Sequence, residues 1–140
     1  MEDLSHFMEI ARKIFARASR VDYAFIFGSV LKRPGPQSDI DFLVGGKLGF
    51  ADKAELSYQL AMELKKEIDI VLVEETSCEL AMKAFSQGKK IVALRPQALK
   101  KDYFRNYCLF EQTSGLRDLK LDHLRRRYGN GRPKSSAKQN

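Results

Sequence analysis

The pattern of apolar and polar residues divides the chain into helical and extended segments. Apolar residues recur at intervals of three and four from position 4 to 18, which predicts an amphipathic helix. Short apolar runs, rich in β-branched and aromatic residues, predict three strands at 23–27, 40–44 and 68–73 and indicate a fourth at 91–94.

Helix-forming sequences separate these runs. Residues 51–66 and 78–86 predict two helices, and a long helical stretch is expected over 98–128, with Gly115 interrupting or bending it. Residues 30–37 contain two prolines and a glycine, which predicts a loop. This order of elements indicates a small α/β (α+β) fold, in which a mixed sheet is flanked by helices and followed by a long helical region.

The length of 140 residues fits a single domain with one hydrophobic core. We expect that domain to span residues 1–128, with a core at about 20–95 and a C-terminal helical region at about 97–128. The glycine, proline and serine content of residues 129–140 predicts a flexible basic tail.

The net charge of +7 is concentrated at the C-terminus. Residues 116–140 contain eight lysines and arginines but only two aspartates, so the remainder of the chain is nearly neutral. Such a segment can attract nucleic acid or an acidic protein, but a solvated end is the more common case. Nucleic acid is therefore the weaker choice of partner.

Cysteine and histidine are too sparse for a zinc site or a disulfide framework. The two cysteines and two histidines form no C-x-x-C or related pattern. The sequence also has no apolar stretch long enough for a membrane span, and no signal peptide is recognisable. We expect a cytoplasmic protein without a membrane partner.

Three aspartates occur where aspartate is disfavoured. Asp41 lies in an apolar strand, Asp69 lies inside another, and Asp39 precedes Asp41 by two residues. Because side chains alternate along a strand, Asp39 and Asp41 are expected on one face, with Ile40 on the other. If the strand of Asp69 lies beside that of Asp41, the three carboxylates converge.

Converging carboxylates need cations, and oxygen ligands select hard ions such as Mg²⁺. A pair of these ions can stabilise both the attacking and the leaving oxygen of a displacement at phosphorus. Gly28 and Ser29, at the end of the first strand, add a turn whose N–H groups and hydroxyl can bind phosphate.

Each aspartate has a plain structural alternative. Asp39 could be a turn residue, Asp41 a charge that protects an edge strand, and Asp69 the partner of Lys65 or Lys66. Because the three aspartates occur together with the Gly-Ser turn, a shared metal site is favoured over a separate structural explanation for each aspartate.

These residues carry a family resemblance. The pattern Gly28-Ser29, a short loop, Ser38-Asp39-x-Asp41 and a later Asp69 resembles the polymerase-beta-type nucleotidyltransferases. Within them it is similar to the minimal nucleotidyltransferases that serve as antitoxins of HEPN-domain toxins, and the resemblance covers roughly residues 25–94.

The resemblance implies a function and a set of roles. Asp39 and Asp41 would ligate magnesium, and Asp69 would be the third ligand and help to activate the acceptor hydroxyl. Gly28 and Ser29 would hold the triphosphate, and we count Ser38 with them as nucleotide-binding. The expected activity is magnesium-dependent transfer of AMP from ATP to a hydroxyl of a HEPN ribonuclease toxin, which silences it.

The loop after Gly28-Ser29 departs from the family pattern. Relatives commonly place an arginine directly after this pair, whereas Val30 and Leu31 follow it here. Lys32 or Arg33 is expected to take over the phosphate contact. The alternative function is a catalytically weak antitoxin that neutralises its partner by binding alone.

Overall fold

The computed structural model describes residues 4–32, 39–117 and 119 of the chain. These residues fall into two compact units, one that extends to Tyr107 and one that begins at Cys108. Each unit is described separately. None of the helices in the described ranges is long and apolar enough to span a bilayer.

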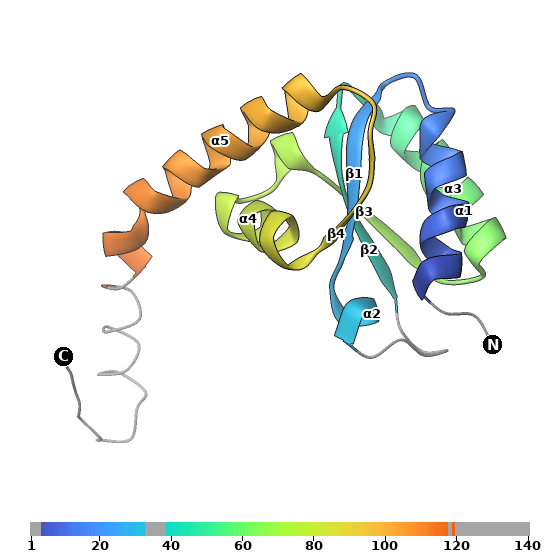
Figure 1. Ribbon diagram of the computed structural model, residues 1–140, viewed down its shortest axis with the longest axis horizontal. Helices are drawn as coiled ribbons and strands as arrows, with labels where there is room; N and C mark the ends of the chain where they lie inside the picture. Colours follow the sequence, from blue (N-terminus) through green and yellow to red (C-terminus); the bar gives the residue numbers. More distant parts are fainter. Residues whose placement is uncertain (1–3, 33–38, 118, 120–140) are drawn as a thin grey trace. The chain divides into compact units, whose positions relative to one another are not determined.

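Four strands form one mixed sheet in the order β3-β2-β1-β4 (Figure 1). β1 (Val21–Phe27) runs antiparallel to both β2 (Ile40–Gly46) and β4 (Lys89–Ala93). β3 (Ile68–Leu72) runs parallel to β2. The four strands expected from the apolar runs are thus confirmed, and so is the mixed α/β fold.

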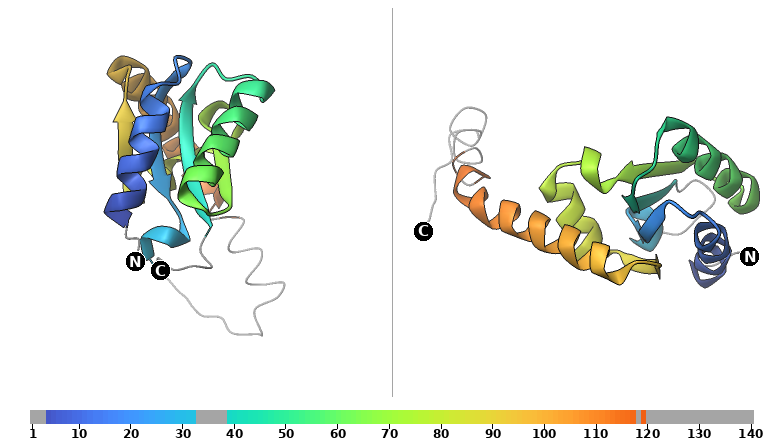
Figure 2. Two further views of the ribbon diagram at one scale, coloured as in Figure 1. Left: turned by 90° about the vertical axis from the view of Figure 1, so that its right-hand side faces the viewer. Right: turned by 90° about the horizontal axis from the view of Figure 1, so that it is seen from above.

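Helices cover both faces of this sheet. α1 and α3 lie on one face and α4 lies on the other (Figures 1 and 2). The helical elements of the described residues are α1 (Leu4–Ala16), α2 (Ser29–Lys32), α3 (Phe50–Leu64), the 3₁₀ turn η1 (Val73–Glu75), α4 (Cys78–Gln87) and α5 (Pro96–Gln112).

The core on the α1 and α3 side holds the larger apolar cluster. Phe15 from α1 and Phe42 from β2 are fully buried and meet edge to face, with ring centroids 5.3 Å apart. On the opposite side, Tyr23 and Phe25 of β1 pack against α4. The sheet is therefore buried on both faces, which fixes which side chains of each strand point to which side.

One sequence-based boundary was wrong. Residues 30–32, expected to begin the loop at 30–37, belong to the single helical turn α2, in which Val30 is fully buried; residues 33–37 lie outside the described residues. The helical stretch expected over 98–128 is interrupted near the expected Gly115: α5 ends at Gln112, and a turn at Thr113 precedes another helical turn that includes Gly115. The remainder of that stretch, and the tail at 129–140, are not described.

The start of α5 is fastened to β1 by polar contacts. The Arg95 guanidinium donates hydrogen bonds to the carbonyls of Ser19 and Val21 and to Asp22. The Tyr23 hydroxyl donates to Oδ2 of Asp102 at 2.9 Å. Burial, together with this hydrogen bond, raises the pKa of Tyr23 above its ordinary value, so the hydroxyl stays a donor at all physiological pH.

The hydroxyl of Tyr23 should contribute to stability. Tyr23→Phe removes one partly buried, charge-assisted hydrogen bond and should lower the free energy of unfolding by about 1–2 kcal/mol. Urea denaturation measures the change. Tyr58→Phe is the matched control, since Tyr58 is 63% exposed on α3; an equal loss in both variants would contradict this role of Tyr23.

Candidate active site

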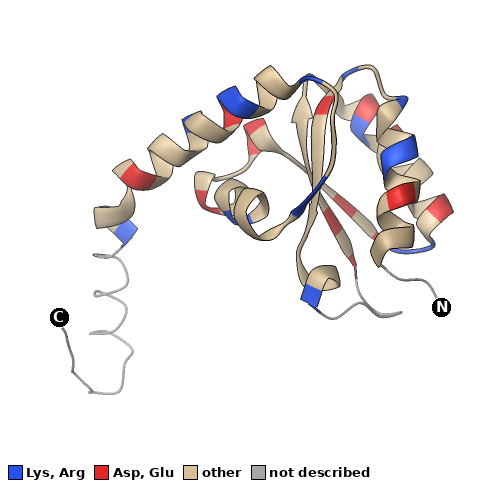
Figure 3. Ribbon diagram, viewed as in Figure 1, with Lys and Arg blue, Asp and Glu red and all other residues tan. Residues whose placement is uncertain are grey.

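Two of the predicted aspartates are register partners on adjacent parallel strands. Asp41 of β2 lies opposite Asp69 of β3, as do the flanking pairs Ile40–Ile68 and Phe42–Ile70. Neighbouring strands are about 4.8 Å apart, and paired residues of parallel strands point to the same face. The strand adjacency on which the convergence of carboxylates depended is thus confirmed (Figure 3).

The carboxylates lie on the face that α4 covers. Ile40 and Phe42 belong to the cluster on the α1 and α3 side, and Leu43 belongs to the opposite one. Asp41 therefore points to the α4 side together with Leu43. Asp39 immediately precedes β2 and is exposed, and its charge reaches Asp41.

The ionised form of the Asp41 carboxylate is electrostatically disfavoured. Partial burial, then the charge of Asp69, then that of Asp39 raise the pKa of Asp41 above its ordinary value. No salt bridge joins Asp39 or Asp41 to a lysine or arginine of the described ranges. The repulsion that acts on Asp41 is therefore not offset by a salt bridge of its own in that part of the chain.

This arrangement removes one of the plain alternatives. Asp41 does not protect an edge strand, because β2 lies between β1 and β3. Of the two lysines considered for Asp69, Lys65 makes no salt bridge with it in the described structure. Asp39, exposed at the start of β2, still occupies a position that would suit a turn residue.

Gly28, at the end of the neighbouring strand, leaves space for the Asp41 carboxylate. Phe27 is the register partner of Asp41, so Gly28 follows at the end of β1, beside the carboxylate. Its φ of +94° lies in a region that favours glycine, and a Cβ at this position would overlap Oδ2 of Asp41. Gly28 therefore lets β1 turn into α2 without displacing the carboxylate.

A pocket of about 440 Å³ opens at this turn. It receives side chains from α2, α4 and β4, and three of them are lysines. Its lining residues are Phe27, Gly28, Ser29, Leu31, Lys32, Lys83, Gln87 and Lys89. A larger pocket of about 700 Å³ lies between α1 and α3, on the other face of the sheet from the aspartates.

The pocket contains three of the predicted nucleotide-binding residues, Gly28, Ser29 and Lys32. Ser38 and Arg33, the other two, lie outside the described residues. Lys83 and Lys89 also line the pocket, although nothing near them in the sequence predicts this. Lys83 comes from α4, and Lys89 from the start of β4, opposite Ile26 of β1.

The arrangement of the aspartates suits an open magnesium site better than a closed site in which protein side chains supply every ligand. Among the described residues, no three His, Cys, Asp or Glu side chains form a ready-made ligand set. Magnesium bound with nucleotides needs only one or two carboxylates, and phosphate oxygens and water complete its shell. The mutually repelling Asp41 and Asp69, with Gly28 of the pocket lining packed against Asp41, match that requirement.

Asp41 should reduce stability when no metal is present. Its raised pKa means that the folded protein holds the proton more tightly, so stability falls as pH rises through the ordinary and then the raised pKa. With a chelator present to remove metal ions, Asp41→Asn should therefore melt at a higher temperature than the wild type at pH 7. This difference in melting temperature should vanish near pH 3, below the ordinary aspartate pKa of about 3.9.

The matched control for that comparison is Glu74→Gln, which removes an exposed carboxylate of η1. It should leave the melting temperature unchanged at both pH values. A lower melting temperature for Asp41→Asn at pH 7 would contradict the repulsion described above.

The role of Gly28 can be tested by adding one methyl group. Gly28→Ala should lower the free energy of unfolding by about 1–3 kcal/mol, because of its positive φ and the overlap with Asp41. Gly115→Ala, at a helical position with nothing within 4 Å, should be neutral or stabilising by up to about 1 kcal/mol. Urea denaturation separates the two, and equal effects would contradict the assigned packing.

Known proteins share this architecture. A family model for polymerase beta nucleotidyltransferases matches residues 9–96, more than half of the chain. A toxin–antitoxin crystal structure with AMP-PNP is 20% identical with a TM-score of 0.71, covering 84% of this chain and 97% of that one. The toxin–antitoxin MntA–HepT is 19% identical with a TM-score of 0.67, covering 86% and 97%.

A third structure contains a tri-AMPylated HEPN toxin of Shewanella oneidensis in complex with MNT antitoxin; it is 19% identical with a TM-score of 0.64, covering 84% and 98%. At these sequence identities, the similarity to the three solved structures shows a shared fold and nothing more. No curated protein matches the sequence. The family model, in contrast, spans the whole sheet with its aspartates and Gly28-Ser29, and the chain belongs to the polymerase beta nucleotidyltransferase family.

Proposed function

We propose that this chain is a magnesium-dependent nucleotidyltransferase that moves AMP from ATP to a hydroxyl group of a HEPN-domain toxin and thereby acts as its antitoxin. The observation that carries the proposal is the in-register pair Asp41 and Asp69, with Asp39 near them and Gly28 packed against Asp41. This carboxylate group adjoins a pocket that contains the phosphate-binding turn expected from the sequence.

The aspartates divide the work between holding metal and moving a proton. Asp39 and Asp41 would hold magnesium, and Asp69, on the neighbouring strand, would share in this. Magnesium, when bound, supplies the positive charge that neutralises the triphosphate and the carboxylates. Asp69 would also accept the proton of the acceptor hydroxyl, and its exposure on the edge strand β3 supports this role.

The reaction is a displacement at the α-phosphorus. The hydroxyl oxygen of the acceptor forms a bond to that phosphorus, the bond to the bridging oxygen of the β-phosphate breaks, and pyrophosphate leaves. Ser29 is exposed beside Gly28 and would donate a hydrogen bond to a phosphate oxygen. These steps need positioning and charge stabilisation more than covalent participation by the protein.

The proposed partner follows from the complexes that share the fold. Similar structures contain a toxin with an antitoxin, one of them with AMP-PNP and another with an AMPylated HEPN toxin. A HEPN-domain protein is therefore the first acceptor to test. Cytoplasmic location and the use of two magnesium ions belong to the same proposal.

The direct test is transfer of label from α-labelled ATP to a HEPN-domain protein encoded beside this chain, with magnesium present. Asp41→Asn should reduce transfer by at least about 100-fold, because it removes charge at the site of metal binding. Asp39→Ala/Asp41→Ala should abolish it. Glu74→Gln, which removes an exposed carboxylate of η1, should transfer label like the wild type.

Wild-type activity in Asp39→Ala/Asp41→Ala would rule out the assigned site. If no label is transferred but the two proteins elute as one complex, the chain neutralises its partner by binding alone. Transfer to a small molecule but not to the protein would leave the catalytic assignment intact and refute the acceptor.

A further inference from the structure

We propose that Lys83 and Lys89 are the binding residues for the β- and γ-phosphates, and thus for the pyrophosphate leaving group. This inference rests on the proposed function and adds two cations to the phosphate contacts expected of Gly28, Ser29 and Lys32.

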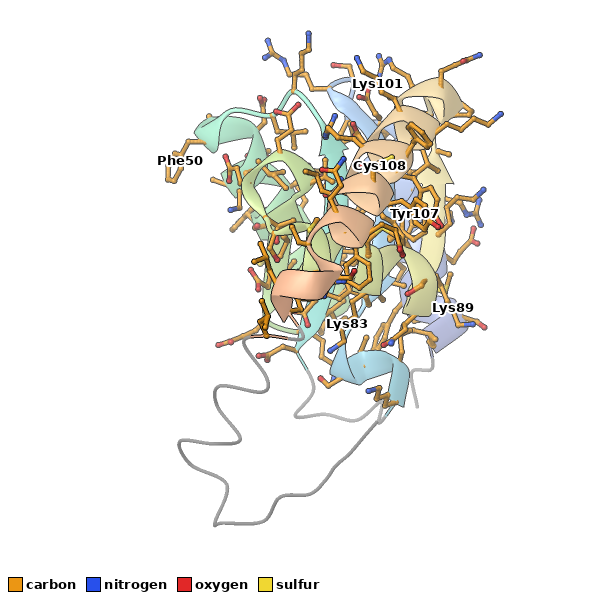
Figure 4. The ribbon with its side chains drawn as sticks, turned by 90° about the vertical axis from the view of Figure 1, so that its left-hand side faces the viewer. Phe50, Lys83, Lys89, Lys101, Tyr107 and Cys108 are labelled. Atoms are coloured by element: carbon orange, nitrogen blue, oxygen red, sulfur yellow. The ribbon has the colours of Figure 1, made fainter. Side chains whose placement is uncertain are left out.

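Both lysines enter the same pocket as the Gly28-Ser29 turn, but from different elements. Lys83 lies on α4 and Lys89 is the first residue of β4. Figure 4 shows both at the end of the sheet where α2 lies. Lys32 of α2 completes a set of three ammonium groups around one opening.

The positions of Lys83 and Lys89 are fixed by a tight connection. Gly88 joins α4 to β4, and a Cβ there would come within 2.6 Å of the carbonyl oxygen of Ile26. The Gly88 N–H also donates to the carbonyl of Ala84 at 2.9 Å, which ends α4. The backbone that carries both lysines is thus packed against β1 just before Gly28.

The charges on the two flanks of β1 are opposite. Asp41 lies opposite Phe27 on one side, and Lys89 lies opposite Ile26 on the other. Ile26 belongs to the cluster on the α1 and α3 side and Phe27 to the opposite one, and the described lining of the pocket does not include the aspartates. A metal-bound triphosphate that reaches from the carboxylates to the lysines would therefore pass the end of β1 at Gly28. Gly28, between the two flanks, lets the backbone approach the ligand.

The lysines are available for a ligand. Lys83 and Lys89 are both exposed, and neither makes a salt bridge to an aspartate or glutamate of the described residues. Val30, by contrast, is fully buried and Leu31 packs against the core, so the positions directly after Ser29 cannot present a cation. Lys83 and Lys89 therefore add to the charge of Lys32 from elements outside this turn.

The test measures binding of inorganic triphosphate, in magnesium, by calorimetry, so that it does not depend on turnover. Lys83→Gln/Lys89→Gln should weaken binding by about tenfold, the loss expected from two exposed charge-assisted contacts. The control is Lys90→Gln, which removes the same charge from the next residue of β4, outside the pocket lining. It should bind like the wild type.

AMP lacks the β- and γ-phosphates, and its affinity should be equal in the wild type and in Lys83→Gln/Lys89→Gln. The assignment is overturned if the wild type does not bind triphosphate, if the double variant and Lys90→Gln bind it equally well, or if AMP and triphosphate lose affinity alike.

Failure of the proposed function would have a different signature. If the wild type binds triphosphate through these lysines but transfers no label from α-labelled ATP, the anion site stands and the nucleotidyltransferase activity does not. If label is transferred while the double variant binds triphosphate normally, the activity stands and the lysine assignment falls.

Discussion

The structure holds like charges together on two adjacent strands of the sheet, and the rest of the fold must keep them there. Asp41 and Asp69 occupy paired positions on β2 and β3, and Asp39 adds a third negative charge nearby. Repulsion of this kind destabilises a fold unless a cation or a change in protonation relieves it. Such a group suits the proposed binding of a cation, which would offset the stability that the repulsion costs the metal-free protein.

The apolar core is what holds these charges in place. Ile40 and Ile70 point into the cluster on the α1 and α3 side, so a shift of either strand by one residue would move an aspartate into that core. The burial of one face therefore specifies the position of the carboxylates on the other. Gly28 adds a local condition, because any side chain there would collide with Asp41.

The sequence predicted the parts of the site that depend on local pattern. Asp41 and Asp69 stood out because aspartate is rare in apolar strands, and alternation predicted a common face for Asp39 and Asp41, whereas the pairing of Asp41 with Asp69 came only from the structure. The proposed roles of Lys83 and Lys89 could not be predicted in this way, since they depend on where α4 and β4 lie beside β1. The helical turn at Ser29–Lys32 was missed because the burial of Val30 outweighs the loop signal of the prolines that follow.

The central claim, that the aspartates bind a metal together with a nucleoside triphosphate, is tested most directly by crystals grown with manganese and a non-hydrolysable ATP analogue. Anomalous scattering locates manganese independently of the protein phases. The account predicts a peak within coordination distance of the Asp41 carboxylate and of Asp39 or Asp69, with phosphate oxygens completing the shell. A fully bound nucleotide with manganese elsewhere, or with no manganese at the aspartates, would contradict it.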